Sequence, residues 1–213
     1  MNNPIFSWAQ WALLSVYLVI LAGAIVRMTG SGMGCPDWPK CFGYLIPPTE
    51  RSQLDWKPEN TYKKGNVIIY ENTLRVATKD FNSSTTIDLS NWDIYDKHDY
   101  TTFNTTHTWV EFINRLLGAI SGLIVLGLFI RSLWWIRSTP ILAVFSFLTV
   151  VGMGIQAWLG KTVVDSNLLP SKISLHMIMA LLIVSGLLII LAKSHANQIQ
   201  LPSKKCTNLI IFA

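Results

Sequence analysis

The sequence predicts an all-α membrane protein, a bundle of four transmembrane helices with a small β-containing insertion outside the membrane. Apolar residues make up 51% of the 213 residues and charged residues only 14%, whereas soluble domains carry about 25% charged residues. Four stretches are apolar over about 20 residues, the length of helix that crosses roughly 30 Å of hydrocarbon. Helices satisfy their own backbone polar groups, as lipid requires. These observations together predict the membrane bundle.

The apolar stretches place the spans, and the polar residues between them define the other parts of the chain. We expect the four spans at residues 1–28, 108–131, 139–160 and 171–193. The first is longer than the core of a secretory signal, about 7–15 residues, and no basic segment precedes it, so we expect it to be retained. Residues 29–48 form a cap rich in Gly and Pro, and residues 49–107 form a polar insertion. A new apolar run at residues 206–213 predicts the start of a fifth helix, and hence a fragment of a longer protein.

Basic residues in the short connections predict the orientation of the spans. Arg131 and Arg137 lie at or just after the end of the second span, and Lys193, Lys204 and Lys205 lie at or after the end of the fourth. Because short basic loops stay in the cytoplasm, we expect a multi-pass protein with a cytoplasmic N-terminus and an extracytoplasmic first loop. The net charge of +5 is then a signal of topology, and it gives no reason to expect nucleic acid as a partner.

Two cysteines lie close together in the predicted outer cap. Cys35 and Cys41 are on the side where oxidation is permitted, while Cys206 is on the reducing side. The segment GCPDWPKC can close a small disulfide loop, and two free thiols or half of a metal site are the alternatives. No further Cys or close His completes a zinc set, which favours the disulfide.

The insertion has the pattern of a small β-domain. Residues 66–70 and 73–78 are rich in β-forming residues and are separated by Glu71-Asn72, which predicts a hairpin. We expect three aromatic residues to form its core, because so small an insertion needs every aromatic to stay folded; they are Trp56, Phe81 and Trp92. Sugar binding by exposed aromatics is the alternative.

The second span begins with a polar face. At 100° per residue, His107, Glu111, Asn114 and Arg115 fall on one side of the helix. Ionisable residues inside a membrane helix are costly unless they face a cavity or a partner, so this face is a candidate site. The alternative is an interfacial Glu–Arg pair near the headgroups.

The fourth span contains one polar outlier, His176. It either forms a hydrogen bond with a neighbouring helix or serves as an axial ligand of a heme. At 1.5 Å per residue its depth differs from that of Asn114 by only a few Å, so we expect Glu111, Asn114, Arg115 and His176 to share a pocket. Arg27, at the end of the first span, either reaches lipid headgroups or pairs with an anionic substrate group.

Four segments resemble, in this order, the signatures of the heme A synthase family. They are GAIVRMTGSGMGCPDWPKCFG, TWVEFINRLLGAISG, QAWLGKTVVDSNL and SLHMIMALL. The resemblance covers all four spans and skips residues 49–107, which look like an insertion found in Bacteroidetes-type homologues. It implies an eight-span protein of the bacterial inner (plasma) membrane, built from two similar four-helix halves. One half holds a heme b cofactor and the other takes heme o as its substrate.

The resemblance also implies roles for individual residues. Glu111 matches the catalytic carboxylate, His176 the heme-iron ligand, and Cys35 and Cys41 the outer disulfide pair. Arg115 matches the arginine that closes the family's Glu-x-x-His-Arg motif, and we expect it to contact a heme propionate.

One position departs from the family pattern. Asn114 stands where the motif has a histidine, so either the iron binds His176 alone or His107 takes the second place. His107 lies about 10 Å higher on the same face, which favours the first alternative.

The function that the resemblance implies is the oxidation of a methyl group of heme o to the formyl group of heme A, for terminal oxidase biogenesis. This chain corresponds to the substrate half, with the iron of heme o ligated by His176 and heme b expected in the other half. Implied partners are heme o, heme o synthase and oxidase assembly factors. Two alternatives are an electron-transfer module, which needs paired histidines, and a heme carrier, which has no need for an acid such as Glu111.

Overall fold

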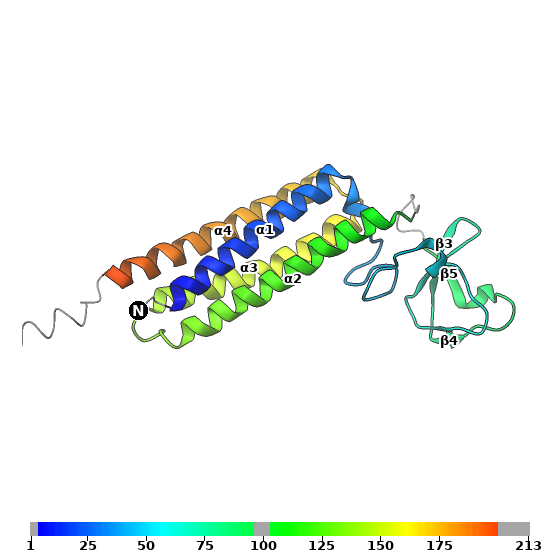
Figure 1. Cartoon of the computed structure of the whole chain (residues 1–213), viewed down its shortest axis with the longest axis horizontal. Coiled ribbons are helices and arrows are strands. Elements are labelled where there is room, and N and C mark those ends of the chain that lie inside the picture. Colours follow the sequence, from blue (N-terminus) through cyan, green and yellow to red (C-terminus); the bar gives the residue numbers. More distant parts are fainter. Residues whose placement is uncertain (1–3, 96–102, 200–213) are drawn as a thin grey trace, which may run out of the picture. The chain divides into compact units, whose positions relative to one another are not determined.

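The computed structural model describes residues 4–95 and 103–199, and within them it contains four long helices and five short strands (Figure 1). The helices are α1 (Pro4–Met28), α2 (Thr105–Leu133), α3 (Pro140–Asp165) and α4 (Pro170–Ile199). The strands are β1 (Thr61–Tyr62), β2 (Val67–Tyr70), β3 (Thr73–Ala77), β4 (Phe81–Asn82) and β5 (Trp92–Ile94). Each long helix has the length and hydropathy of a membrane span, which confirms the predicted fold class. The expected fifth helix, at residues 206–213, lies outside the described residues.

Local sequence signals explain where the helices begin and end. The side-chain oxygen of Asn104 accepts hydrogen bonds from the backbone N–H groups of Thr106 (3.0 Å) and His107 (3.2 Å), so it caps α2. Helices α3 and α4 both begin at a proline, the residue whose missing N–H costs nothing there. After Asp165 the chain turns through Asn167 and Leu168, which both have positive φ, and α3 ends.

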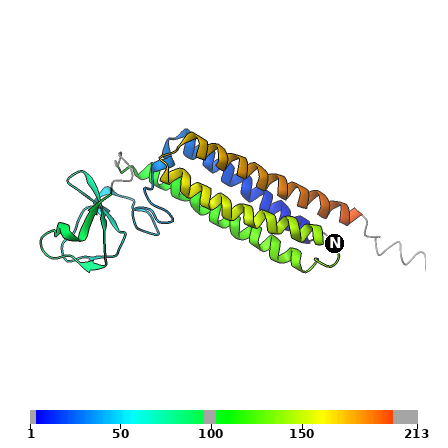
Figure 2. The same cartoon turned by 180° about the vertical axis from the view of Figure 1, so that it is seen from behind.

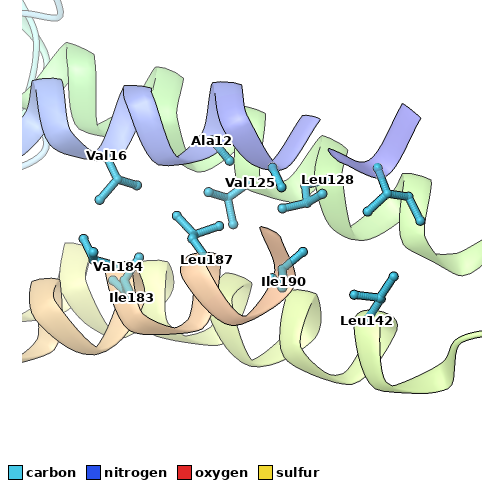
Figure 3. Packing of buried hydrophobic residues seen from close by; sticks show 11 residues of the cluster. Ala12, Val16, Val125, Leu128, Leu142, Ile183, Val184, Leu187 and Ile190 are labelled. Atoms are coloured by element: carbon cyan, nitrogen blue, oxygen red, sulfur yellow. The ribbon is translucent and has the colours of Figure 1, made fainter. Parts of the chain in front are cut away.

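The chain divides into two compact units, which are described separately. The first contains residues 1–20, 117–158 and 175–213. In this unit all four helices contribute to one apolar core, and they lie side by side in both views (Figures 1 and 2). Figure 3 shows the side chains that meet there: Ala12, Val16, Val125, Leu128, Leu142, Ile183, Val184, Leu187 and Ile190.

Close helix contacts in this unit rely on small and hydroxylated residues. The hydroxyl groups of Ser15 in α1 and Ser121 in α2 are hydrogen-bonded at 3.0 Å, and Gly127 leaves room for the Trp8 ring to cross α2. Both kinds of contact are typical of membrane helices, because the hydrophobic effect does not drive helix association within lipid. Many large apolar side chains remain exposed, among them Leu123 and Leu181. These features describe a multi-pass membrane protein whose helices face lipid.

The second unit contains residues 21–116 and 159–174, and its strands form two small antiparallel sheets. Strand β3 lies between β2 and β5, and β1 pairs with β4. The predicted hairpin is confirmed: β2 and β3 pair with Tyr70 opposite Thr73. Glu71 and Asn72 between them both have positive φ, as a two-residue hairpin turn requires.

The aromatic core predicted for the insertion is also present. Trp92 is buried together with Tyr62, and Trp56 and Phe81 pack against this cluster. The Phe81 and Trp92 rings meet edge to face, with centroids 5.4 Å apart. This arrangement supports a packing role for the aromatics.

Trp92→Ala should unfold the insertion locally, because it removes the largest side chain of this cluster. Large-to-small changes at buried aromatics cost about 3–5 kcal/mol, and Trp92 is 4% exposed. Hydrogen exchange of the β2 and β3 amides in the intact chain measures this loss. Ile94→Ala is the matched control, since Ile94 lies on the same strand and is 62% exposed. Equal exchange rates in the two variants would contradict this account of the core.

Candidate functional site

A disulfide-closed loop lies against the first turns of α2, within the second unit. Cys35 and Cys41 form the disulfide, with Cα atoms 4.8 Å apart, and both residues are buried. The structure therefore contains the disulfide rather than two free thiols. Among the described residues no group of three or more His, Cys, Asp or Glu could hold a metal ion, so no donor set of that kind surrounds the pair.

Asp37 fixes the shape of this loop from inside. Its carboxylate accepts the backbone N–H of Phe42 (2.5 Å) and of Gly43 (2.8 Å), which closes a turn in which both residues have positive φ. Burial raises the pKa of Asp37 above its ordinary value of 3.8, because desolvation outweighs these hydrogen bonds and the charge of Arg115.

Tyr95 holds the same loop from the insertion. Its hydroxyl donates to the carbonyl of Pro36 at 2.7 Å. Burial, with the carboxylates of Asp37 and Asp165 nearby, raises the pKa of Tyr95 to about 12. The hydroxyl therefore keeps its proton, and the hydrogen bond, across the physiological pH range.

Glu111 lies beneath the disulfide loop and is 4% exposed. One carboxylate oxygen accepts the backbone N–H of Cys35 at 2.8 Å, and the other accepts a hydrogen bond from Arg115. This is the ion pair that the spacing of four residues allows. Its burial argues against the alternative of an interfacial pair in contact with headgroups.

Arg115 connects α2 to three carbonyl groups of the loop. One terminal nitrogen donates to the carbonyls of Asp37 (2.7 Å) and Lys40 (3.0 Å). The other donates to the carbonyl of Cys35 (3.3 Å) and to Glu111. Because a guanidinium carries two N–H groups on each terminal nitrogen, these four contacts match its four terminal donors.

The loop approaches α2 so closely that one position admits only glycine. A Cβ on Gly34 would overlap the backbone carbonyl of His107. At this contact the Thr108 hydroxyl, which is fully buried, donates to the carbonyl of Gly34 at 2.8 Å. The first turn of α2 therefore forms part of the surface on which the loop packs.

The other candidate residues of this unit have fewer contacts. Within the described residues, the Asn114 side-chain oxygen is buried without a hydrogen-bond partner, and it lies 3.8 Å from a Cβ placed on Gly23 in α1. Arg27 is exposed at the end of α1, and in the part of the chain that the structure describes no hydrogen bond or ion pair involves its side chain. His107 is half-buried in the first turn of α2.

His176 belongs to the first unit, where it meets α3. A ring nitrogen, Nε2, lies 3.1 Å from the Nε2 atom of Gln156. Its other ring nitrogen and the Gln156 side-chain oxygen are both buried without a partner among the described residues. A half-buried imidazole with one unpartnered nitrogen fits the requirement for an iron ligand. The pocket expected to join His176 to Glu111 stays a prediction.

Sequence analysis missed several contributors to these sites, among them Asp37, Thr108 and Gln156. The role of Asp37 could have been predicted, since aspartate is a frequent partner of backbone N–H groups in turns that contain glycine. The contacts of Thr108 and Gln156 could not have been predicted, because a hydroxyl or an amide in a span is equally compatible with a contact inside its own helix.

Comparisons with known proteins converge on one family. The model of the cytochrome oxidase assembly protein family, COX15-CtaA, matches residues 6–88 and 85–213. A heme A synthase of Shewanella oneidensis is 24% identical over 201 residues, which cover 94% of this chain and 49% of that protein. A heme A synthase of Rickettsia prowazekii is 26% identical over 222 residues, covering 100% of this chain and 57% of that protein.

A shorter match has a higher sequence identity. A heme A synthase of Shouchella clausii is 57% identical over 57 residues, 26% of this chain and 17% of that protein. The chain spans about half the length of the curated relatives that it matches over most of its sequence. No solved structure matches it significantly.

Arg115→Lys should loosen the disulfide loop, because one ammonium group cannot reproduce the planar fork that reaches three carbonyls and Glu111. If the contact between the loop and α2 loses at least about 1.4 kcal/mol, the loop opens about tenfold more often. We therefore expect dithiothreitol to reduce the Cys35–Cys41 disulfide at least about tenfold faster in this variant. Thiol labelling of the folded chain over time measures the rate. Arg27→Lys is the matched control and should react like the wild type. A rate in Arg115→Lys equal to that of the control would refute the anchoring role.

Proposed function

Because the chain belongs to the family of cytochrome oxidase assembly proteins, COX15-CtaA, we propose that it forms the part of a heme A synthase that binds heme o. The reaction oxidises a methyl group of heme o to a formyl group. This change removes four electrons from the substrate, and protons must leave the reacting carbon as it proceeds. The heme b cofactor that the resemblance assigns to the other half would be held by residues that this chain does not contain.

The observation that carries this proposal is the buried carboxylate of Glu111. An ionisable side chain in a membrane helix is costly and is a functional candidate for that reason. The Glu111 carboxylate accepts hydrogen bonds from the backbone N–H of Cys35 and from Arg115, and the backbone N–H of Gly34 contributes a further hydrogen bond. Glu111 thus has a fixed position, and a carboxylate held in this way can accept a proton or stabilise a cationic centre.

His176 is the candidate ligand for the iron of heme o. Histidine is the usual axial ligand of heme, and one ring nitrogen of His176 is unpartnered among the described residues. Asn114 is a poor iron ligand, so we propose that His176 alone ligates the iron from this chain. His107 remains the alternative second ligand.

Arg115 and Arg27 differ in how many N–H donors remain available to bind an anionic substrate group. The terminal donors of Arg115 are directed at the disulfide loop and Glu111. Arg27 is exposed, and within the described residues its side chain makes no ion pair. We therefore propose Arg27 as the principal contact of a heme propionate. The same contact for Arg115, through its remaining N–H, stays a prediction.

The setting of this function follows from the topology proposed for the chain. The family resemblance implies the bacterial inner membrane, and the basic connections favour a cytoplasmic N-terminus with the disulfide loop on the extracytoplasmic side. Heme o synthase and oxidase assembly factors are the protein partners that this function implies, and the lipid bilayer surrounds the helices.

His176→Ala and Glu111→Gln should separate binding from chemistry. His176→Ala should deplete heme o from membranes that express the complete protein, and heme A should disappear. Glu111→Gln is nearly isosteric, so heme o should stay bound while heme A formation falls about 100-fold or more, the scale of a general acid–base contribution. Extraction and chromatography of the hemes measure both quantities.

Two outcomes would contradict the proposal. Unchanged heme o content in His176→Ala would exclude His176 as the ligand. Normal heme A formation in Glu111→Gln would leave Glu111 a purely structural role.

A further inference from the structure

A polar contact joins α3 to α4 inside the first unit. Gln156 and His176 are 20 residues apart in the sequence, and their side chains meet at 3.1 Å between the amide Nε2 and the ring Nε2. Both residues are half-buried. One turn earlier in α3, Gly152 faces the apolar side chains of Met179 and Ile183 in α4.

The contact leaves two polar atoms without partners. Among the described residues, the side-chain oxygen of Gln156 and the Nδ1 atom of His176 are both buried and make no hydrogen bond. An unsatisfied buried polar group costs about 1–3 kcal/mol, and each such group in a native structure requires an explanation. A ligand that binds the free ring nitrogen would satisfy one of them.

The orientation of the Gln156 amide decides which of its atoms faces His176. A glutamine amide presents either its oxygen or its nitrogen to the same neighbour after a rotation of 180°. A neutral imidazole that ligates a metal offers a lone pair on one nitrogen and carries its proton on the other. With the amide oxygen turned towards His176, Gln156 accepts that proton in an N–H···O bond.

We propose that Gln156 is a positioning residue for His176. Its amide oxygen accepts the N–H of one ring nitrogen and leaves the lone pair of the other for heme iron. This inference rests on the proposed function, in which His176 ligates the iron of heme o. Partners of this kind fix the orientation and tautomer of a ligating histidine and increase its basicity, and a more basic ligand stabilises ferric iron.

Substitutions of similar size at Gln156 test the hydrogen bond to His176 separately from the volume of the side chain. Gln156→Leu removes the acceptor and should weaken binding of ferric protoporphyrin IX about 10–100-fold, the usual effect of losing such a partner. It should also raise the reduction potential of the bound iron. Gln156→Glu supplies a stronger acceptor, so it should restore the affinity and lower the potential below that of the wild type.

The experiment uses the purified chain in lipid nanodiscs, with hemin as the probe. Titration followed by the Soret band gives the affinity, and spectroelectrochemistry gives the potential. Ser146→Ala is the control, because Ser146 is a buried, unpartnered hydroxyl on the same helix, about 15 Å away along its axis. It should bind hemin like the wild type.

The outcomes separate this inference from the proposed function. If His176→Ala binds hemin with the affinity and spectrum of the wild type, the proposed function fails and the inference falls with it. If His176→Ala loses hemin but Gln156→Leu keeps wild-type affinity and potential, only the inference is overturned. A Gln156→Glu variant that behaves like Gln156→Leu would also overturn it, since the effect would then come from packing. The predicted pattern is loss in His176→Ala, weakening in Gln156→Leu and rescue in Gln156→Glu.

Discussion

The candidate site of the second unit depends on the contact between the Arg115 guanidinium and the disulfide-closed loop. A buried cation is tolerated only when its donors find acceptors, because an unpaired charge away from water costs far more than any one contact returns. Arg115 meets this requirement with the carbonyls of Cys35, Asp37 and Lys40 and with the Glu111 carboxylate. The loop must therefore present these three carbonyls to α2. Its remaining features, the disulfide and the turn that Asp37 closes, are means of holding that shape.

The same network fixes the carboxylate that we propose for the chemistry. Glu111 is held between a charge on its own helix and a backbone N–H of the loop. The pair of Gln156 and His176 in the first unit is held differently, by one contact between neutral side chains. Polar groups in spans are usually retained for function. A fixed acid and a histidine whose second ring nitrogen has no partner among the described residues are the two elements that the proposed function uses.

How far the sequence predicted this structure depended on whether a feature is local. The four spans, the hairpin turn at Glu71-Asn72 and the pairing of nearby cysteines follow from hydropathy or short spacing, and the structure contains all of them. The Glu111–Arg115 pair follows from a spacing of four residues, but the carbonyl partners of Arg115 were not predictable, because they lie about 75 to 80 residues away in the sequence. Gln156 lay within a segment used for the family resemblance, yet nothing in its neighbours indicated that it meets His176. Contacts between helices depend on their rotation, which hydropathy leaves open.

The Glu111 carboxylate acts together with Arg115 to hold the disulfide loop against α2, through the hydrogen bond that it accepts from the amide of Cys35. Hydrogen exchange of that single amide, compared between the wild type and Glu111→Ala, tests it most directly. A hydrogen bond to a charged acceptor is worth about 1.5–3 kcal/mol, so we predict exchange at least about tenfold faster in the variant. An amide of Cys35 that is equally protected in both proteins would show that the loop keeps its place without Glu111, and would contradict the account.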